Sequence, residues 1–307
     1  MELVARLAHL LSISEQDTLR LILNAPYKYR VYTIPKRTHG RRVIAQPTKV
    51  VKKLQKNFLT LYNFPVHSRC MAYRNGISIK DNAEKHLDNP YLLKMDLSDF
   101  FNSLTPKIFW NTWREFQQLP LPDALEQRLI ENIIFWNNNS KLTLSVGAPS
   151  SPVISNFCLY FFDEKIENYC LKENIVFTRY ADDLTFSTKK NDILFILPNI
   201  VSKYLNEFFE GALTLNNNKT VFSSKAHNRH VTGITITNEG NASIGRERKR
   251  YIKHLLHKYK LNSLNYNDIN HLRGLLAFAF YIEPNFATAL SKKYTQDLLE
   301  KLKEEKG

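Results

Sequence analysis

Three aspartates are the residues of this sequence whose types and positions could do chemistry. Asp182 and Asp183 stand side by side in the segment FTRYADDLTFS, between two apolar runs typical of the strands of a hairpin. An Asp-Asp pair in a turn is by itself a weak signal, because acidic residues are common in solvated turns. Asp96 strengthens it, because it ends the apolar run 92–95, where an unpartnered carboxylate would be costly to bury.

Magnesium is the partner that these carboxylates predict. Mg²⁺ prefers carboxylate oxygens and keeps water and substrate phosphates in its remaining coordination positions. If the strand that carries Asp96 lies beside the hairpin, three carboxylates from two distant segments converge and can hold two metal ions roughly 3.5 to 4 Å apart. Such a pair of ions serves to activate an attacking hydroxyl and to stabilise a pyrophosphate leaving group.

The charge distribution points to a polyanionic partner. The net charge is +14, and residues 18–80 contain 14 Lys and Arg residues but no Asp or Glu. Scattered lysines are usually a solvated face, but an acid-free stretch of this length favours nucleic acid or nucleotide phosphates. The chain has no long apolar run and no signal peptide, so we expect a cytoplasmic protein without membrane contact. Its three cysteines have no C-x-x-C spacing, which predicts neither disulfides nor a zinc site.

The elements that must position the aspartates follow from hydrophobic periodicity and turn residues. The 43% hydrophobic content is ample for a packed core. We expect helices over residues 1–24, with Ser14 as a cap, and over 49–62, 152–171 and 198–209. Strands are expected at 29–34, 42–46, 91–97, 213–215, 231–237 and 242–244, and helices from Arg246 onward. This mixed order, without βαβ alternation, predicts an α+β fold.

Three segments resemble, in order and spacing, the palm motifs of reverse transcriptases: MDLSDFFNS at 95–103, VGAPSSPVISN at 146–156 and RYADDLTF at 179–186. Two further motifs, NAEKH at 82–86 and VTG at 231–233, narrow the resemblance to bacterial retron reverse transcriptases. It runs from about Ile13 to beyond Gly274. It implies a right-hand polymerase fold with fingers and palm in residues 1–240, the fingers mainly in 1–90, and a helical, RNA-binding thumb in 241–307.

The resemblance also implies roles for particular residues. Asp96, Asp182 and Asp183, with the Leu97 carbonyl as an additional ligand, would bind two Mg²⁺ ions. Nucleotide binding is implied for Lys36 and Arg42, which reach the triphosphate, for Phe101, which rejects a 2′-hydroxyl, and for Lys219, which protonates pyrophosphate. A core position for Phe101 and plain solvation for the two lysines remain alternatives.

A structured RNA is the implied substrate. The implied RNA-binding residues are Asn82, His86, Val231, Thr232, Gly233, Arg246, Arg248, Lys249, Arg250 and Lys253. Structured RNA is held through shape, phosphate and 2′-hydroxyl contacts, which suits the basic amino-terminal stretch and tail. For Asn82 and His86 a polar cap at a helix start remains open, and for 231–233 a plain strand.

The expected function is RNA-directed DNA synthesis. By the resemblance, the protein uses dNTPs to copy part of a retron non-coding RNA from a guanosine 2′-hydroxyl. The product is a branched RNA–DNA hybrid, msDNA, within an anti-phage system whose effector is a separate protein. A group II intron-like reverse transcriptase is disfavoured because no maturase or endonuclease region follows the thumb. A non-catalytic RNA-binding scaffold is disfavoured because it has no need of three mutually repelling acids.

The sequence departs from the family pattern at one position. Val146 stands where most relatives carry a Gln that positions the incoming nucleotide. We expect activity to survive this change, with the contact supplied by backbone or by another residue.

Overall fold

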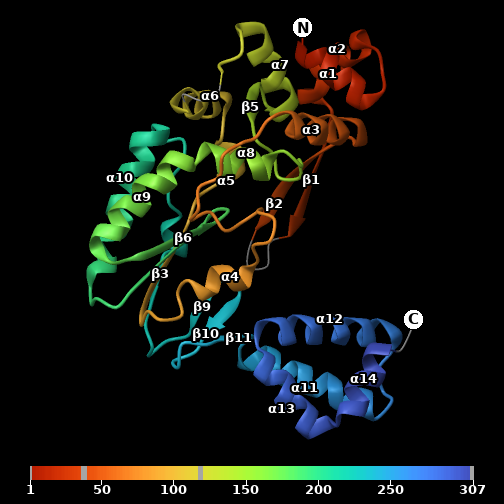
Figure 1. The fold of residues 1–307 in the computed structure, drawn as a ribbon, viewed down its shortest axis with the longest axis vertical. Helices are drawn as coiled ribbons and strands as arrows, with labels where there is room; N and C mark the ends of the chain where they lie inside the picture. The colour runs from red at the N-terminus through yellow and green to blue at the C-terminus, as the bar shows by residue number, and fades with distance from the viewer. Residues whose placement is uncertain (1, 36–39, 117–119, 305–307) are drawn as a thin grey trace.

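The fold is α+β, as expected from the sequence, and its two terminal groups of helices lie at opposite ends of an elongated molecule with the sheets between them (Figure 1). This computed structural model describes residues 2–35, 40–116 and 120–304. In the part of the chain that it describes, no helix has both the length and the apolar character that a membrane crossing requires.

The amino-terminal region combines packed helices with an exposed hairpin. Its helices are α1 (Glu2–Leu11), α2 (Glu15–Asn24), η1 (Ala25–Tyr27), α3 (Lys49–Leu61) and α4 (Ile79–Glu84). Ser14 caps α2 as expected, because its side chain accepts a hydrogen bond from the Asp17 N–H at 3.0 Å. Strands β1 (Tyr29–Pro35) and β2 (Arg41–Pro47) pair antiparallel, and most of their residues are exposed.

A four-stranded sheet forms the centre of the molecule. Its order is β6 (Val176–Tyr180), β7 (Asp183–Thr188), β3 (Tyr91–Asp96) and β8 (Val221–Ser223). Side chains alternate between the two faces of a strand. Leu93 and Met95 accordingly pack into the main core, which α9 (Tyr160–Glu173) and α10 (Leu197–Phe209) cover on one side (Figure 1). Lys94 and Asp96 therefore lie on the opposite face of the sheet.

Shorter elements complete this region. They are α5 (Phe100–Ser103), α6 (Pro106–Glu115), α7 (Ala124–Ile134), β4 (Trp136–Asn138), β5 (Lys141–Thr143), α8 (Ser151–Cys158), η2 (Ile193–Ile196) and η3 (Asn217–Lys219). The helix expected over 152–171 is interrupted at Leu159, which separates α8 from α9. The strand expected at 213–215 is reduced to one bridge between Leu97 and Leu215, and β8, which was not expected, pairs with β3 instead.

The carboxy-terminal region has its own core. A small sheet of β9 (Arg229–Val231), β10 (Ile234–Ile236) and β11 (Ala242–Ser243) shares that core with α11 (Arg246–Lys260), α12 (Tyr266–Ile282), α13 (Pro284–Tyr294) and α14 (Gln296–Glu304). The same core takes in Ala83 of α4 and Leu92 of β3. The boundary expected between residues 240 and 241 stays a prediction, because this core extends across it.

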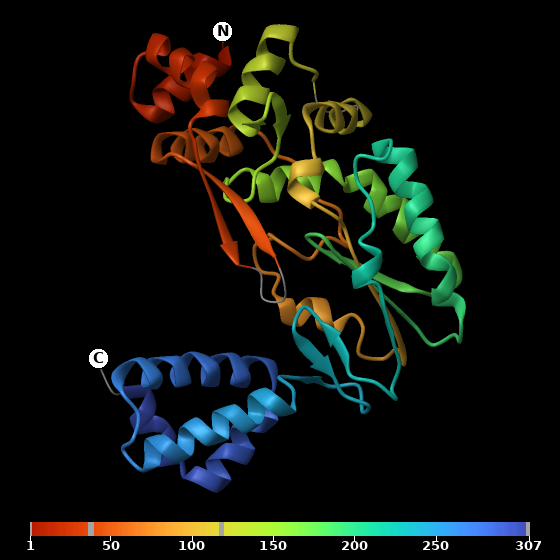
Figure 2. The ribbon, with the colours of Figure 1, turned by 180° about the vertical axis from the view of Figure 1, so that it is seen from behind.

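Helix α4 connects the carboxy-terminal helices to the rest of the chain. It lies against the three-stranded sheet (Figure 2). The Tyr281 hydroxyl of α12 donates to the hydroxyl of Ser78, the cap of α4, at 2.8 Å. Lys80 of α4 donates to the Tyr281 carbonyl at 3.0 Å. These contacts fix the helical tail beside the segment that contains residues 82–86.

Candidate active site

The Asp182–Asp183 pair lies at a tight hairpin turn, as expected. Tyr180 at the end of β6 pairs with Asp183 at the start of β7, so the turn between them consists of Ala181 and Asp182. Ala181 has a φ of 57°, in the left-handed region. A positive φ in a two-residue turn matches the twist of the flanking strands, but it is strained for a residue with a side chain.

Asp96 lies directly opposite this turn. In the β3–β7 register Asp96 is the partner of Asp183, and the Leu97 N–H donates to the Asp182 carbonyl at 2.9 Å. The expectation that the strand carrying Asp96 lies beside the hairpin is therefore confirmed. Leu97 is buried, and its backbone is held from the other side by the bridge to Leu215. Metal ligation by these residues stays a prediction.

The three carboxylates repel one another. Burial raises the pKa of Asp183 from 3.8 to about 6, and the charges of Asp182 and Asp96 add to the shift. Burial likewise raises the pKa of Asp182, with Asp96 as the strongest repelling charge. Asp96 has a counter-charge, because the Lys219 ammonium donates to both of its carboxylate oxygens, at 2.8 and 2.9 Å. Sites of this kind, with excess negative charge, are suited to cations.

The side-chain oxygens of the three aspartates are suitable ligands for magnesium, but the three side chains are not arranged here as a metal site. All three side chains offer the hard oxygen ligands that Mg²⁺ prefers. Within the residues that the structure describes, however, no group of three or more His, Cys, Asp and Glu side chains is arranged to hold an ion. In this structure the Lys219 ammonium, rather than a cation, binds the oxygens of Asp96. The lysine side chain is 57% exposed.

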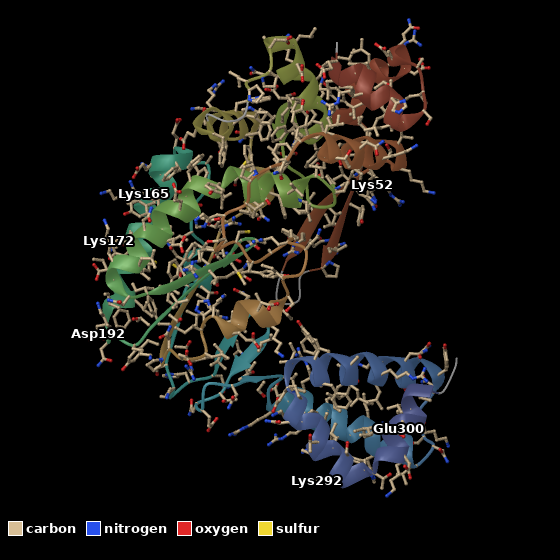
Figure 3. The ribbon with its side chains drawn as sticks, viewed as in Figure 1. Lys52, Lys165, Lys172, Asp192, Lys292 and Glu300 are labelled. Carbon is tan, nitrogen blue, oxygen red and sulfur yellow. The ribbon has the colours of Figure 1, made fainter. Side chains whose placement is uncertain are left out.

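A first cavity, of about 340 Å³, is lined mainly by residues 145–149 and the start of α8. Phe101 lines it together with Val146 and Gly147, and it also packs against the main core, so its contact with the incoming nucleotide stays a prediction. Two further lining residues, Lys52 of α3 and Tyr73, were not singled out by the sequence. Lys52 lies beside the β1–β2 hairpin in Figure 3. Its only signal in the sequence is its membership of the acid-free stretch 18–80.

The backbone at Val146 and Gly147 is packed tightly against β2. The Val146 carbonyl accepts a hydrogen bond from the Ala45 N–H at 3.1 Å. Gly147 has a φ of 121°, and a Cβ there would stand 3.3 Å from the Ala45 carbonyl oxygen, so a larger residue is disfavoured. Arg42 is exposed on β2, and its charge stabilises the Asp182 carboxylate. Lys36 lies outside the described residues.

A second cavity, of about 650 Å³, opens directly on the aspartates. Asp96, Asp183 and Lys219 form one wall of it. Thr232 and Gly233, the turn between β9 and β10, also line it. Thr232 has a φ of 47°, which is unusual for a β-branched residue and marks a strained turn. Three motifs that are far apart in the sequence, at 95–103, 179–186 and 231–233, thus border one cavity.

Asn82 and His86 are fully buried, and RNA binding by these two residues stays a prediction. The Asn82 amide donates to the Thr232 hydroxyl at 3.4 Å, and that hydroxyl donates to the Ile79 carbonyl at 3.3 Å. The His86 ring nitrogens lie 2.7 Å from the Ser187 hydroxyl and 2.8 Å from the Thr178 hydroxyl. The first residue therefore supports the strained turn at Thr232, and the second joins β6 to β7.

The three residues 231–233 differ in how far they are buried. Val231 is fully buried, whereas Thr232 is half-buried and Gly233 is exposed. Only the last two can meet a ligand directly. The side chain of Val231 belongs to the carboxy-terminal core, and its RNA-binding assignment stays a prediction.

The basic residues at the start of α11 do not all face solvent. Arg246, Arg250 and Lys253 are exposed, as an RNA-binding surface requires. Lys249 instead forms an ion pair with Glu283, and the Arg248 guanidinium lies 5.1 Å from the centre of the Phe278 ring. Lys249 and Arg248 therefore contribute to packing between the helices of the tail, as does Lys253, whose ammonium lies 5.9 Å from the centre of the Phe286 ring. RNA binding by all five residues stays a prediction.

Comparison with known proteins gives consistent matches. The family described as Reverse transcriptase (RNA-dependent DNA polymerase) matches residues 34–236. The Retron Ec83 reverse transcriptase of Escherichia coli is 47% identical, over 90% of this chain and 89% of that protein. The Retron Ec86 reverse transcriptase of Escherichia coli is 31% identical, over 94% of this chain and 89% of that protein.

A solved structure supports the fold. Telomerase from Candida albicans aligns with a TM-score of 0.51 and 14% identity, over 86% of this chain and 56% of that chain. At this identity the match concerns the fold alone. The right-hand polymerase fold expected from the sequence is thereby confirmed.

Proposed function

Because this chain belongs to the reverse transcriptase family, and within it to the retron reverse transcriptases, we propose that it copies part of a structured retron RNA from a guanosine 2′-hydroxyl. Family membership establishes RNA-directed DNA polymerase activity, with RNA and DNA as partners. The proposal adds the non-coding RNA, the dNTP substrates and the branched RNA–DNA product, msDNA.

The observation that carries the proposal is the pairing of Asp96 with Asp183 beside the turn residue Asp182. The priming hydroxyl would form a bond to the α-phosphorus of the dNTP while the bond to pyrophosphate breaks. Two Mg²⁺ ions bound by these carboxylates would neutralise charge on the attacking and leaving oxygens. The raised pKa values of Asp182 and Asp183 support this, since uncompensated negative charge favours cation binding.

Other side chains have supporting roles in this proposal. Arg42 and Lys52 would bind the triphosphate, as a guanidinium and an ammonium suit phosphate oxygens. Phe101, in the wall of the first cavity, would leave no room for a ribonucleotide 2′-hydroxyl. Lys219, released from Asp96, would be available to donate a proton to the departing pyrophosphate.

The wider biological role is proposed from the family. In this scheme the protein and its RNA–DNA product belong to an anti-phage system and restrain a separate effector protein. The two alternatives have less support. A group II intron-like enzyme is disfavoured by the 47% identity to a retron reverse transcriptase. A non-catalytic scaffold would not need Asp182 and Asp183 beside Asp96, because the three carboxylates repel one another.

The decisive experiment isolates the protein from cells that express its native operon and analyses the nucleic acid bound to it. We expect a small DNA joined to RNA through a 2′,5′ linkage, which RNase shortens and a debranching enzyme releases. The double variant Asp182→Asn with Asp183→Asn should carry the RNA but no DNA. A linear DNA from a long transcript, or full synthesis by the double variant, would refute the proposal.

A further inference from the structure

The second cavity contains a lysine that the catalytic scheme leaves without a role. Lys94 lies in the middle of β3. It is on the same face as Asp96, because the two residues are at positions i and i+2 of one strand. It lines the cavity of about 650 Å³ together with Asp96, Asp183 and the turn at Thr232. The position of a lysine at the centre of a sheet requires an explanation, because desolvation of its ammonium group is costly.

Lys94 makes no side-chain hydrogen bond or ion pair among the residues that the structure describes. Its register partners are Thr185 on β7 and Val221 on β8, and both are neutral. The other acid on its strand, Asp96, already binds the Lys219 ammonium. Asp183 feels the positive charge of Lys94, which lowers its pKa slightly, but no hydrogen bond or ion pair joins the two in the described part of the chain. A half-buried ammonium facing an open cavity predicts an anionic ligand.

The position of this cavity indicates which anionic ligand Lys94 would bind. The first cavity, with Phe101 and Tyr73, and the second, with Asp96 and Asp183, share no lining residue. Asp96 and Asp183 line the second cavity, and Phe101 lines the first, so the segment from Asp96 to Phe101 connects the two cavities. If the incoming nucleotide occupies the first cavity, the nucleotide that carries the attacking hydroxyl occupies the second.

Priming from a 2′-hydroxyl places one more phosphate in that second cavity than ordinary priming does. A primer that ends in a 3′-hydroxyl has no phosphate beyond the reacting sugar. When a 2′-hydroxyl inside an RNA chain attacks, the chain continues through the 3′-oxygen of the same ribose. Its next phosphodiester must therefore lie beside the catalytic aspartates, where its negative charge needs a cation.

The turn at Thr232 and Gly233 leaves room for this continuing chain. Gly233 has a φ of 82°, is exposed, and has no atom within 4 Å of the place where a Cβ would stand. A backbone without a side chain allows another chain to approach closely. Asn82 supports the turn from behind through the Thr232 hydroxyl. Lys94 and this turn therefore border the same open space from two sides.

We propose that Lys94, facing the Thr232–Gly233 turn across the second cavity, binds the phosphodiester on the 3′ side of the priming guanosine. Lys94 would thus be a specificity determinant for priming from a 2′-hydroxyl. This inference rests on the proposed function, because it requires an internal priming nucleotide. Lys94 would otherwise serve only to moderate the charge of Asp183 or to bind departing pyrophosphate, and both of those roles are independent of the primer.

The test uses a retron RNA nicked immediately after the priming guanosine, so that its 3′ position can be varied. One version carries a 3′-phosphate and the other is 3′-deoxy, and both retain the 2′-hydroxyl. We expect wild-type protein to initiate about tenfold faster on the phosphate version, as a charge-assisted contact of about 1.5 kcal/mol requires. Lys94→Met should lower this ratio to about one, whereas Lys94→Arg should keep most of it, because arginine also binds phosphate.

Two controls separate the possible outcomes. Lys172→Met removes an exposed lysine of α9, far from the cavity, and should leave the ratio at its wild-type value (Figure 3). Extension of a DNA primer with a 3′-hydroxyl reports polymerase activity independently of branching. A folded Lys94→Met variant that keeps the wild-type preference, or a wild-type enzyme with none, overturns the inference. If neither RNA yields a 2′-linked product while the DNA primer is extended, the proposed priming reaction itself is wrong.

Discussion

Replacement of Asp163 by Asn tests what holds the Ala181–Asp182 turn in place. Asp163, in the first turn of α9, and Arg179 of β6 are both completely buried. The Arg179 guanidinium donates to the two Asp163 oxygens at 2.7 and 2.6 Å. It also donates to the carbonyl of the strained residue Ala181 at 3.0 Å and to the Asn156 side-chain oxygen at 3.4 Å. Asp163 thus positions Arg179, which in turn positions the residue before Asp182.

The expected loss follows from the burial of this pair. Removing one partner of a buried ion pair costs about 3–5 kcal/mol, because the other charge stays desolvated and unpaired. Asn keeps the volume and one acceptor of Asp163, so we expect about 3 kcal/mol for Asp163→Asn. Typical domains have a total stability of about 5–15 kcal/mol, so the variant remains folded. A displaced turn should still lower the rate of DNA synthesis at least about tenfold, because catalysis depends steeply on atomic position.

The assay is urea denaturation followed by circular dichroism, with single-nucleotide incorporation measured on the same samples. The matched control lies on the same helix. Lys165 and Glu207 form an ion pair at 3.5 Å, with side chains 46% and 48% exposed, and Lys165→Met should cost under about 1 kcal/mol. Figure 3 shows Lys165 on the outer side of α9.

A double variant separates stability from positioning. Replacing both members, Arg179→Met with Asp163→Leu, removes the unpaired charge and should recover much of the lost stability. It should not recover activity, because the Ala181 carbonyl still lacks its donor. The reasoning is refuted if Asp163→Asn costs no more than Lys165→Met, or if the double variant restores synthesis along with stability.

Three further predictions concern the turn and its surroundings. Burial lowers the pKa of His86 from 6.5 to about 3, so its contribution to stability is present above pH 6.5 and is lost as the pH falls toward 3. In His86→Gln the urea midpoint should therefore depend less on pH between 6.5 and 3. A variant with the same pH dependence as the wild type would contradict this prediction. The pKa of Asp183 is raised to about 6, so its ionisation destabilises the fold as the pH rises from about 4 to 6. Without metal, Asp183→Asn should therefore raise the Tm at pH 7.5 but not at pH 3.5. An equal effect at both pH values would argue against an unfavourable charge on Asp183. Phe101→Ala should raise ribonucleotide incorporation at least about tenfold in competition with dNTPs, and unchanged sugar selectivity would remove Phe101 from the gate.

Much of the fold could be predicted from the sequence where one pattern determines one element. The strand that ends at Asp96, the hairpin around Asp182, and the cap at Ser14 were all expected, because periodicity and turn residues are local properties. The strand β8 was missed, because three residues with two exposed side chains carry no periodic signal. The break at Leu159 was also missed, because the run on both sides of it is helical in composition.

Three palm motifs and two flanking motifs in the order of one family were enough to predict the family and the candidate catalytic residues. How those motifs contact one another depends on the tertiary structure. It placed Asp96 opposite Asp183, buried Asn82 behind Thr232 and His86 between β6 and β7, and paired Lys249 with Glu283. Register, burial and pairing depend on segments that are far apart in the chain, so no local pattern records them. For the same reason Lys94 could not stand out among 43 basic residues until the sheet placed it in the cavity beside the aspartates.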